Sequence, residues 1–126
     1  MKHSIIGGEF KLADGTKLPL SKAVRAGDFV FLSGQLGLKK DGALADGIAQ
    51  QTLCCLKNIE ELLSSASLTK KNVIKTTVWL TDVTHFAEFN AIYAETFDSA
   101  PPARSTVCSA LALPKALVEI EVVAYG

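Results

Sequence analysis

The residues best suited to chemistry in this chain are one arginine and two glutamates, each carried on a β-branched segment. Arg104 follows Pro101 and Pro102 with only Ala103 between, and a β-branched stretch comes directly after it. Proline fixes φ and cannot continue a helix, so the chain arrives extended and presents Arg104 on a rigid strand. A planar guanidinium held in this way suits a carboxylate, which it binds through two parallel hydrogen bonds.

The two glutamates alternate with apolar residues in the segment 118–122. Glu119 and Glu121 therefore share one face of a predicted strand, and the apolar residues share the other. A solvated sheet face explains this pattern as well as a site does, and Glu121 would then pair with a lysine at an exposed rim. Arg104 and Thr106 also share a face, which is compatible with a shared site. The sequence does not say which strands are neighbours, so it leaves the two glutamates as competing acids.

Composition bounds what the chain can be. Its 126 residues are 48% hydrophobic, which predicts one domain spanning residues 1–126. Thirteen basic and thirteen acidic side chains give a formal net charge of +0, so we expect no nucleic-acid partner. No apolar run approaches the roughly 18 residues of a membrane span, and the N-terminal residues 1–8 hold no signal-peptide core. Three cysteines without metal or disulfide spacing indicate reduced thiols and a cytoplasmic protein.

The common catalytic motifs are missing from the sequence. His85 is expected at the surface, at the start of a helix, with no second histidine or cysteine near it in a ligand pattern, so we expect no metal site. The serines lack a Gly-x-Ser-x-Gly elbow and a partner histidine, and no glycine-rich nucleotide loop occurs. Arginine, glutamate, hydroxyls and backbone amides remain for chemistry.

Hydrophobic periodicity predicts the elements that must position these residues. A turn or hairpin is expected at Asp14-Gly15, with an unreadable path over 9–20. Alternation in 73–81 places Ile74 with Val78 on one face and Trp79 on the other. Strands are expected over 23–25, 28–32, 73–81, 104–110 and 118–124, with helices over 46–67 and from 82 or 84 through 97.

This order of elements predicts an α+β fold with one mixed sheet and both helices on a single face. The strand 28–32 is apolar enough to be buried on both sides. The other sheet face, which carries Trp79, has no third layer to cover it. Self-association is the economical cover.

Six segments of the chain, taken in order, form a recognisable set. They are Ala26–Gln35, Val73–Leu80, Phe86–Asn90, Pro102–Val107, Leu113-Pro114 and Val118–Glu121. Together they closely resemble the RidA (YjgF/YER057c/UK114) family of reactive-intermediate deaminases over nearly the whole chain. The resemblance implies a chorismate-mutase-like (YjgF-like) fold. It also implies a homotrimer whose sheets face a central barrel, with small-molecule sites in clefts between subunits.

The resemblance also implies an activity and the residues that carry it. Family members hydrolyse reactive enamines and imines, of the 2-iminobutanoate and 2-iminopropanoate type, to 2-keto acids and ammonia without a cofactor, which is metabolite damage control. Matched by position, Arg104 binds the substrate carboxylate and Glu119 is the acid near the reacting nitrogen. The other matched substrate-binding positions are Ser33, Gly34, Asn90 and Thr106. A protonated imine needs an oriented water and a proton acceptor or donor, rather than a covalent nucleophile.

The chain departs from the family pattern at two places. Where archetypal members carry Pro-Tyr-x-Gln, this sequence has Leu20 after Pro19, and a glutamate common after Arg-Ser-x-Val is Cys108. Leu20, at the pocket lip, lacks the phenol. We therefore expect a preference for more apolar imino acids, or weaker activity.

Two other classes of function stay open. One is a non-catalytic trimer that binds a carboxylate or 2-keto acid at Arg104 as a sensor or carrier. The other is an RNA-directed role, as a translation inhibitor or ribonuclease. Zero net charge and the lack of aromatic-basic clusters argue against the RNA-directed role.

Overall fold

The computed structural model describes residues 3–12 and 14–126, so Met1, Lys2 and Ala13 of the predicted 1–126 unit lie outside the described residues. The strands are β1 (Ser4–Lys11), β2 (Lys17–Ala26), β3 (Phe29–Leu36), β4 (Val73–Leu80), β5 (Ala103–Cys108) and β6 (Val118–Tyr125). The helices are α1 (Gly47–Ser65) and α2 (Phe86–Thr96), with short 3-10 turns η1 (Lys70–Asn72) and η2 (Val83–His85).

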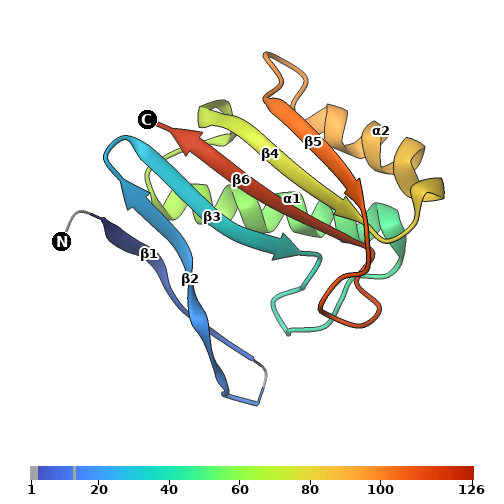
Figure 1. Ribbon diagram of the computed structural model, residues 1–126, viewed down its shortest axis with the longest axis horizontal. Coiled ribbons are helices and arrows are strands. Elements are labelled where there is room, and N and C mark those ends of the chain that lie inside the picture. The colour runs from blue at the N-terminus through green and yellow to red at the C-terminus, as the bar shows by residue number, and fades with distance from the viewer. Residues whose placement is uncertain (1–2, 13) are drawn as a thin grey trace.

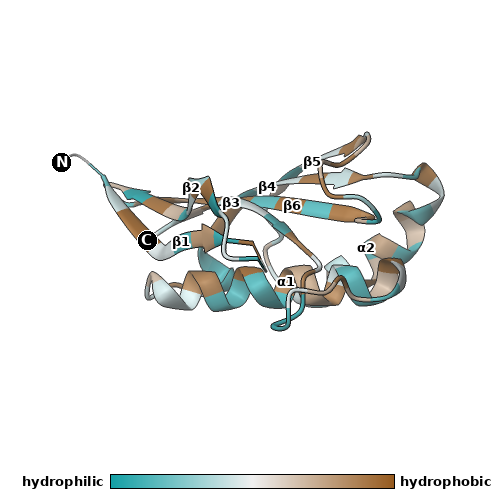
Figure 2. Cartoon of the chain, turned by 90° about the horizontal axis from the view of Figure 1, so that it is seen from below, coloured by the Kyte–Doolittle hydropathy of each residue, from teal (hydrophilic) through white to brown (hydrophobic). Residues whose placement is uncertain are grey.

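The strands form one six-stranded sheet in the order β1-β2-β3-β6-β4-β5 (Figure 1). β4 and β5 are parallel and are joined through α2, whereas the other neighbours are antiparallel. Both helices lie on the same side of the sheet (Figure 2). The predicted mixed sheet with two helices on one face is confirmed. The residues before the core form a hairpin, β1 and β2, which agrees with the turn or hairpin predicted at Asp14-Gly15 and gives the path that the sequence left unreadable.

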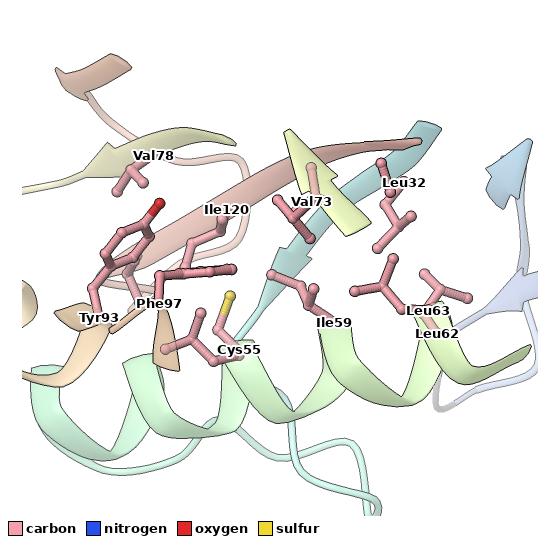
Figure 3. Close-up of a cluster of buried hydrophobic side chains, with 14 of the residues drawn as sticks. Leu32, Cys55, Ile59, Leu62, Leu63, Val73, Val78, Tyr93, Phe97 and Ile120 are labelled. Atoms are coloured by element: carbon pink, nitrogen blue, oxygen red, sulfur yellow. The ribbon is translucent and has the colours of Figure 1, made fainter. Parts of the chain in front are cut away.

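The core lies between α1, α2 and the covered face of the sheet (Figure 3). The apolar stripe of α1 faces inward as its periodicity predicts, with Cys55, Ile59 and Leu63 almost fully buried. The Cys55 thiol donates to the Gln35 carbonyl at 3.0 Å, and burial raises its pKa, so it behaves as a packed small side chain.

The predicted facing of β4 was wrong at its first residues. An irregularity in pairing between Val73 and Lys75 resets the alternation, so Val73 enters the core and Ile74 stays 45% exposed. Thr76, Val78 and the strand end follow Val73 on the covered face. A bulge of this kind changes which face every earlier residue occupies, and simple period-2 counting does not detect it.

The opposite sheet face has no covering layer within the described chain. It carries large apolar side chains, and Phe29 and Phe31 are 41% and 46% exposed although this strand was expected to be buried on both faces. Tyr125 packs edge-on against Phe29, with ring centroids 5.1 Å apart. We call this surface, with Phe29, Phe31, Trp79, Val107 and Tyr125 upon it, the open face.

Candidate functional site

Arg104 is the second residue of β5, at the entrance to the strand, as the two prolines before it predict. It is partly buried, and its guanidinium carbon lies 4.8 Å from the ring centroid of Tyr93. The rings of Phe89 and Phe86 are at 5.7 Å and 5.8 Å. Contacts of this kind stabilise a cation over an aromatic face. We call these three rings the aromatic seat.

The three rings of the aromatic seat lie along one stripe of α2. Phe89 and Tyr93 are buried, but Phe86 is 41% exposed, so the stripe forms both core and site wall. The hydroxyls of Tyr93 and Thr76 are 2.8 Å apart and share a hydrogen bond, which fixes the ring closest to Arg104. Burial is the main cause of the raised pKa of Tyr93, so its phenol stays protonated at neutral pH.

Two further polar groups of this region lie buried without a partner among the described residues. They are Asn90 Oδ1 in α2 and His85 Nδ1 directly before the helix. Asn90 lies four residues after Phe86 and three before Tyr93, so helical spacing places it on the flank of the aromatic seat. The prediction of His85 as a surface residue was wrong, since it is only partly exposed. A buried unpartnered amide oxygen beside a cation is suited to a ligand that brings its own donor.

Glu119 lies on β6 and is partly buried. Burial is the first cause that raises the pKa of its carboxyl above the ordinary value, and the negative charge of Glu121 is the second. A carboxyl in such surroundings exchanges a proton nearer to neutral pH than an exposed one does. Glu121, next along the same face, is exposed.

The Glu119 carboxylate lies directly against the backbone of Gly34. A Cβ built on Gly34 would overlap Glu119 Oε2 and stand 2.9 Å from its Cδ, so any other residue here would displace the carboxylate. Gly34 sits in an irregular stretch of β3, where the pairing with β6 shifts between Leu32 and Gln35. Beside it, Ser33 Oγ donates to the Ser21 carbonyl at 2.6 Å. The absence of a side chain at Gly34 thus makes room for the carboxylate of Glu119.

A cavity of about 770 Å³ opens beside Glu119. Among the predicted site residues, Leu20, Ser33 and Gly34 line it together with Glu119, and Glu121 lines it as well. Its remaining walls come from β1, the following loop, β2, the end of β3 and the loop after it, α1 and the segment 112–113. The three apolar hairpin residues Phe10, Leu12 and Leu18 were not singled out from the sequence, because the path of this segment could not be predicted.

The predicted residues form two groups on opposite faces of the sheet. Arg104 pairs with Thr76, which is fully buried on the helix side, whereas Glu119 pairs with Trp79 on the open face. The arginine half-site is Arg104, Thr106, Asn90 and the aromatic seat. The glutamate half-site is Glu119, Ser33, Gly34 and Leu20. Because β4 lies between β5 and β6, one chain does not bring the two half-sites together.

Residues 3–12 and 14–126 contain no group of three or more histidine, cysteine or acidic side chains that could hold a metal ion. No helix among them is long and apolar enough to cross a membrane.

Both the fold and the sequence match one family of known proteins. The fold is that of RidA from an Antarctic Psychrobacter bacterium, whose structure superposes with a TM-score of 0.86 at 32% identity and covers 98% of this chain and 99% of that one. The model of the family described as Endoribonuclease L-PSP matches residues 13–126. The chain belongs to this family, which is also called the YjgF/RidA family.

Relatives with assigned names are similar over most of their length. The chain is 43% identical over 110 residues to a RutC family protein of Pyrococcus horikoshii, which covers 85% of this chain and 86% of the relative. It is 39% identical over 115 residues to the human 2-iminobutanoate/2-iminopropanoate deaminase, covering 89% of this chain and 83% of the human protein.

Proposed function

We propose that this protein is a hydrolytic deaminase of small, carboxylate-bearing imines and enamines. The observation that carries the proposal is the state of Arg104. Its guanidinium is seated on three aromatic rings, and the ion pairs of the described residues, Glu9–Lys17 and Lys40–Glu61, do not include it. A fixed cation with free donors suits a carboxylate ligand. The name of the human relative, a deaminase of 2-iminobutanoate and 2-iminopropanoate, supports the choice of substrate.

The proposed active site is shared between copies of the chain in a homotrimer. Two features support this arrangement: the arginine and glutamate half-sites lie on opposite faces of one sheet, and the open face exposes large apolar side chains. Packing the open faces together would bury this apolar surface. Because β5 is an edge strand of the sheet, the arginine half-site on it would then lie at the boundary with the neighbouring chain, where it could meet that chain's glutamate half-site.

In the proposed mechanism, the arginine half-site orients the substrate. Arg104 binds the carboxylate through two hydrogen bonds, the backbone amide of Thr106 adds a third, and Asn90 Oδ1 accepts a hydrogen bond from the ligand. Fixing the carboxylate also fixes the adjacent imine carbon, where water must attack. This positioning contributes to the rate because a loosely held substrate would meet water in many unproductive orientations.

Glu119 moves the protons in this mechanism. The ionised carboxylate takes a proton from water as the oxygen bonds to the protonated imine carbon, and the electron pair of the C=N bond moves to nitrogen. Glu119 then returns the proton to the amine of the resulting carbinolamine. As the C–N bond breaks, its electron pair leaves with ammonia, and the hydroxyl gives its proton to the ionised Glu119 while the C=O bond forms. The 2-keto acid and ammonia leave, and ammonia takes the proton from Glu119 as ammonium, which restores the carboxylate. A carboxyl with a raised pKa performs both transfers better than an ordinary one near neutral pH, because its pKa lies closer to the working pH.

The test compares Arg104→Ala with the wild type on freshly generated 2-iminopropanoate. We expect kcat/KM to fall by about 100-fold or more, because two charge-assisted hydrogen bonds to the carboxylate are lost. Arg25→Ala is the matched control, since Arg25 donates only to the carbonyls of Gly126 and Ala66 in the described chain. Its loss should lower stability and leave kcat/KM near the wild-type value. Unchanged turnover in Arg104→Ala would reject the proposal.

The same proteins separate the other functions. A binding protein would retain 2-keto-acid affinity through Arg104 yet would not accelerate imine hydrolysis in the wild type. The family description names an endoribonuclease. RNA cleavage by the wild type that is lost in Arg104→Ala, with no effect on imines, would favour that function instead.

The three free cysteines, Cys54, Cys55 and Cys108, support placing the protein in the cytoplasm.

A further inference from the structure

The cavity beside Glu119 exists because β2 separates from β3. The two strands pair only over Ala23–Ala26 and Phe29–Leu32. Beyond this point β2 continues to pair with β1, and β3 continues along β6. The far part of the β1–β2 hairpin therefore diverges from β3, as Figure 1 shows. The cavity lies between this part of the hairpin and β3.

The hairpin is held in place at its base. A Cβ on Gly7 would stand 2.7 Å from Leu62 Cδ1, so β1 packs directly against α1 there. Across the hairpin, Glu9 and Lys17 form an ion pair at 2.6 Å. The first contact fixes β1 against α1, and the ion pair joins the two strands of the hairpin. The hairpin is therefore a fixed wall of the cavity.

Large apolar side chains form much of the wall. Four come from the hairpin, one from α1, and three from β3 and the loops that follow β3 and β5. They are Phe10, Leu12, Leu18, Leu20, Leu62, Leu36, Leu38 and Leu113. Leu20 and Leu12 are 43% exposed in the described chain, so the surface that they offer is free to contact a ligand. Of the charged lining residues, Lys40 and Glu61 pair with each other.

The same cavity begins at the reacting end of the proposed site, because Glu119, Ser33 and Gly34 line it. A substrate whose imine carbon faces Glu119 would extend its side chain toward the hairpin. Ligand sites of roughly 300–1,000 Å³ enclose molecules far larger than a three-carbon imino acid. At about 770 Å³, with leucine and phenylalanine side chains in its walls, the cavity has room for a side chain much larger than a methyl group.

From this geometry we infer that the preferred substrates are imines with a large apolar side chain, of the kind derived from leucine or phenylalanine, and that the β1–β2 hairpin selects them. The inference rests on the proposed deaminase function and specifies its substrate class. Each methylene group buried in an apolar pocket is worth about 10- to 200-fold in discrimination between substrates. A leucine-type side chain therefore gains more from this wall than a methyl group does.

The first experiment needs no variant. The imines of leucine and alanine are generated from the amino acids by an oxidase, and their disappearance is followed with and without the protein. We expect kcat/KM for the leucine-derived imine to exceed that for the alanine-derived imine by about tenfold or more. Equal or reversed values would overturn the inference while leaving the deaminase function intact.

The second experiment assigns the preference to the hairpin. Leu20→Asn places a polar amide on the wall, and we expect the leucine-to-alanine ratio of kcat/KM to fall by about tenfold. Leu53→Asn is the matched control, because Leu53 is 45% exposed, lies on α1 and does not line the cavity. An unchanged ratio in Leu20→Asn would overturn the role of the hairpin.

A binding measurement separates failure of the inference from failure of the function. Titration calorimetry with 4-methyl-2-oxopentanoate and with pyruvate compares the same side chains without any turnover. Tighter binding of the larger keto acid, together with no hydrolysis of either imine, would reject the deaminase and keep the ligand class. Equal binding of the two keto acids would overturn the inference regardless of activity.

Discussion

Gly34 and Glu119 lie so close that the identity of one fixes the position of the other. A single methyl group on Gly34 would occupy the space of Glu119 Oε2. We therefore expect Gly34→Ala to lower kcat for imine hydrolysis by about 100-fold, within the range of one proton-transfer role, with little change in the melting temperature. Steady-state kinetics and a thermal melt measure both quantities.

The control for this prediction is a double-mutant cycle with Glu119→Gln. If the alanine acts by displacing the carboxylate, the double variant should be no worse than Glu119→Gln alone. Fully additive losses in kcat would mean that Gly34 contributes through some other contact.

Glu121 is the residue that adjusts the proton affinity of Glu119. Its negative charge helps to raise the pKa of Glu119, so Glu121→Gln should lower that pKa. The proposed base must be ionised, and activity therefore rises with pH through this pKa. We expect the acid limb of the profile of kcat/KM against pH to move to lower pH in Glu121→Gln.

Glu60→Gln, an exposed change on α1, removes the same charge away from the cavity and should leave the limb where it is. Movement of the limb to higher pH in Glu121→Gln, or no movement, would show that Glu119 is not the titrating base. This pair of profiles also decides between the two glutamates that the sequence leaves as competitors.

The side chain of Gln51 connects α1 to the segment before β6 through two hydrogen bonds. It is 3% exposed, its Oε1 accepts from the Leu117 amide at 2.8 Å, and its Nε2 donates to the Lys115 carbonyl at 3.3 Å. The cavity residue Leu113 belongs to the same segment. One amide side chain thus holds a loop that neither strand nor helix periodicity constrains.

We expect Gln51→Ala to lower the free energy of unfolding by about 2 kcal/mol, because two part-buried backbone groups lose their partner. Urea unfolding measures the change. Gln50→Ala, an exposed neighbour on the same helix, should change it by less than about 0.5 kcal/mol. Equal effects from the two variants would mean that the Gln51 hydrogen bonds contribute nothing net.

Periodicity predicted most elements correctly because their signals are local. The α1 stripe and the alternation of β6 each follow from side-chain direction alone. β1 was not predicted, because its residues are largely exposed and include Gly7 and Gly8, so no apolar period marks it. The facing of Ile74 was wrong because a bulge depends on the partner strand, which a single sequence does not specify.

Trimers assembled from two different inactive variants test whether the active site is shared between chains. If each site takes Arg104 from one chain and Glu119 from its neighbour, inactive Arg104→Ala and Glu119→Gln proteins should restore activity when they assemble together. Random mixing into three-membered rings gives about a quarter of the wild-type activity. Each variant assembled with itself is the control. If trimers shown to contain both variants remain inactive, Arg104 and Glu119 must act within one chain.

Sequence parity placed the two glutamates on one face correctly and could go no further with the site. Whether Arg104 and Glu119 meet in one chain depends on the strand order and register. The order places β4 between their two strands, and the register places them on opposite faces of the sheet. The aromatic seat was not predicted, because a helical stripe does not reveal that the ring of Phe86 lies 5.8 Å from the guanidinium carbon of Arg104.

The seating of Arg104 on rings rather than against a carboxylate leaves its charge uncompensated in a protein whose formal net charge is +0. Such a molecule has no long-range field to steer anions, and at physiological ionic strength one cation acts over about 8 Å. Capture of an anionic substrate is therefore a short-range event, and added salt should slow it only slightly.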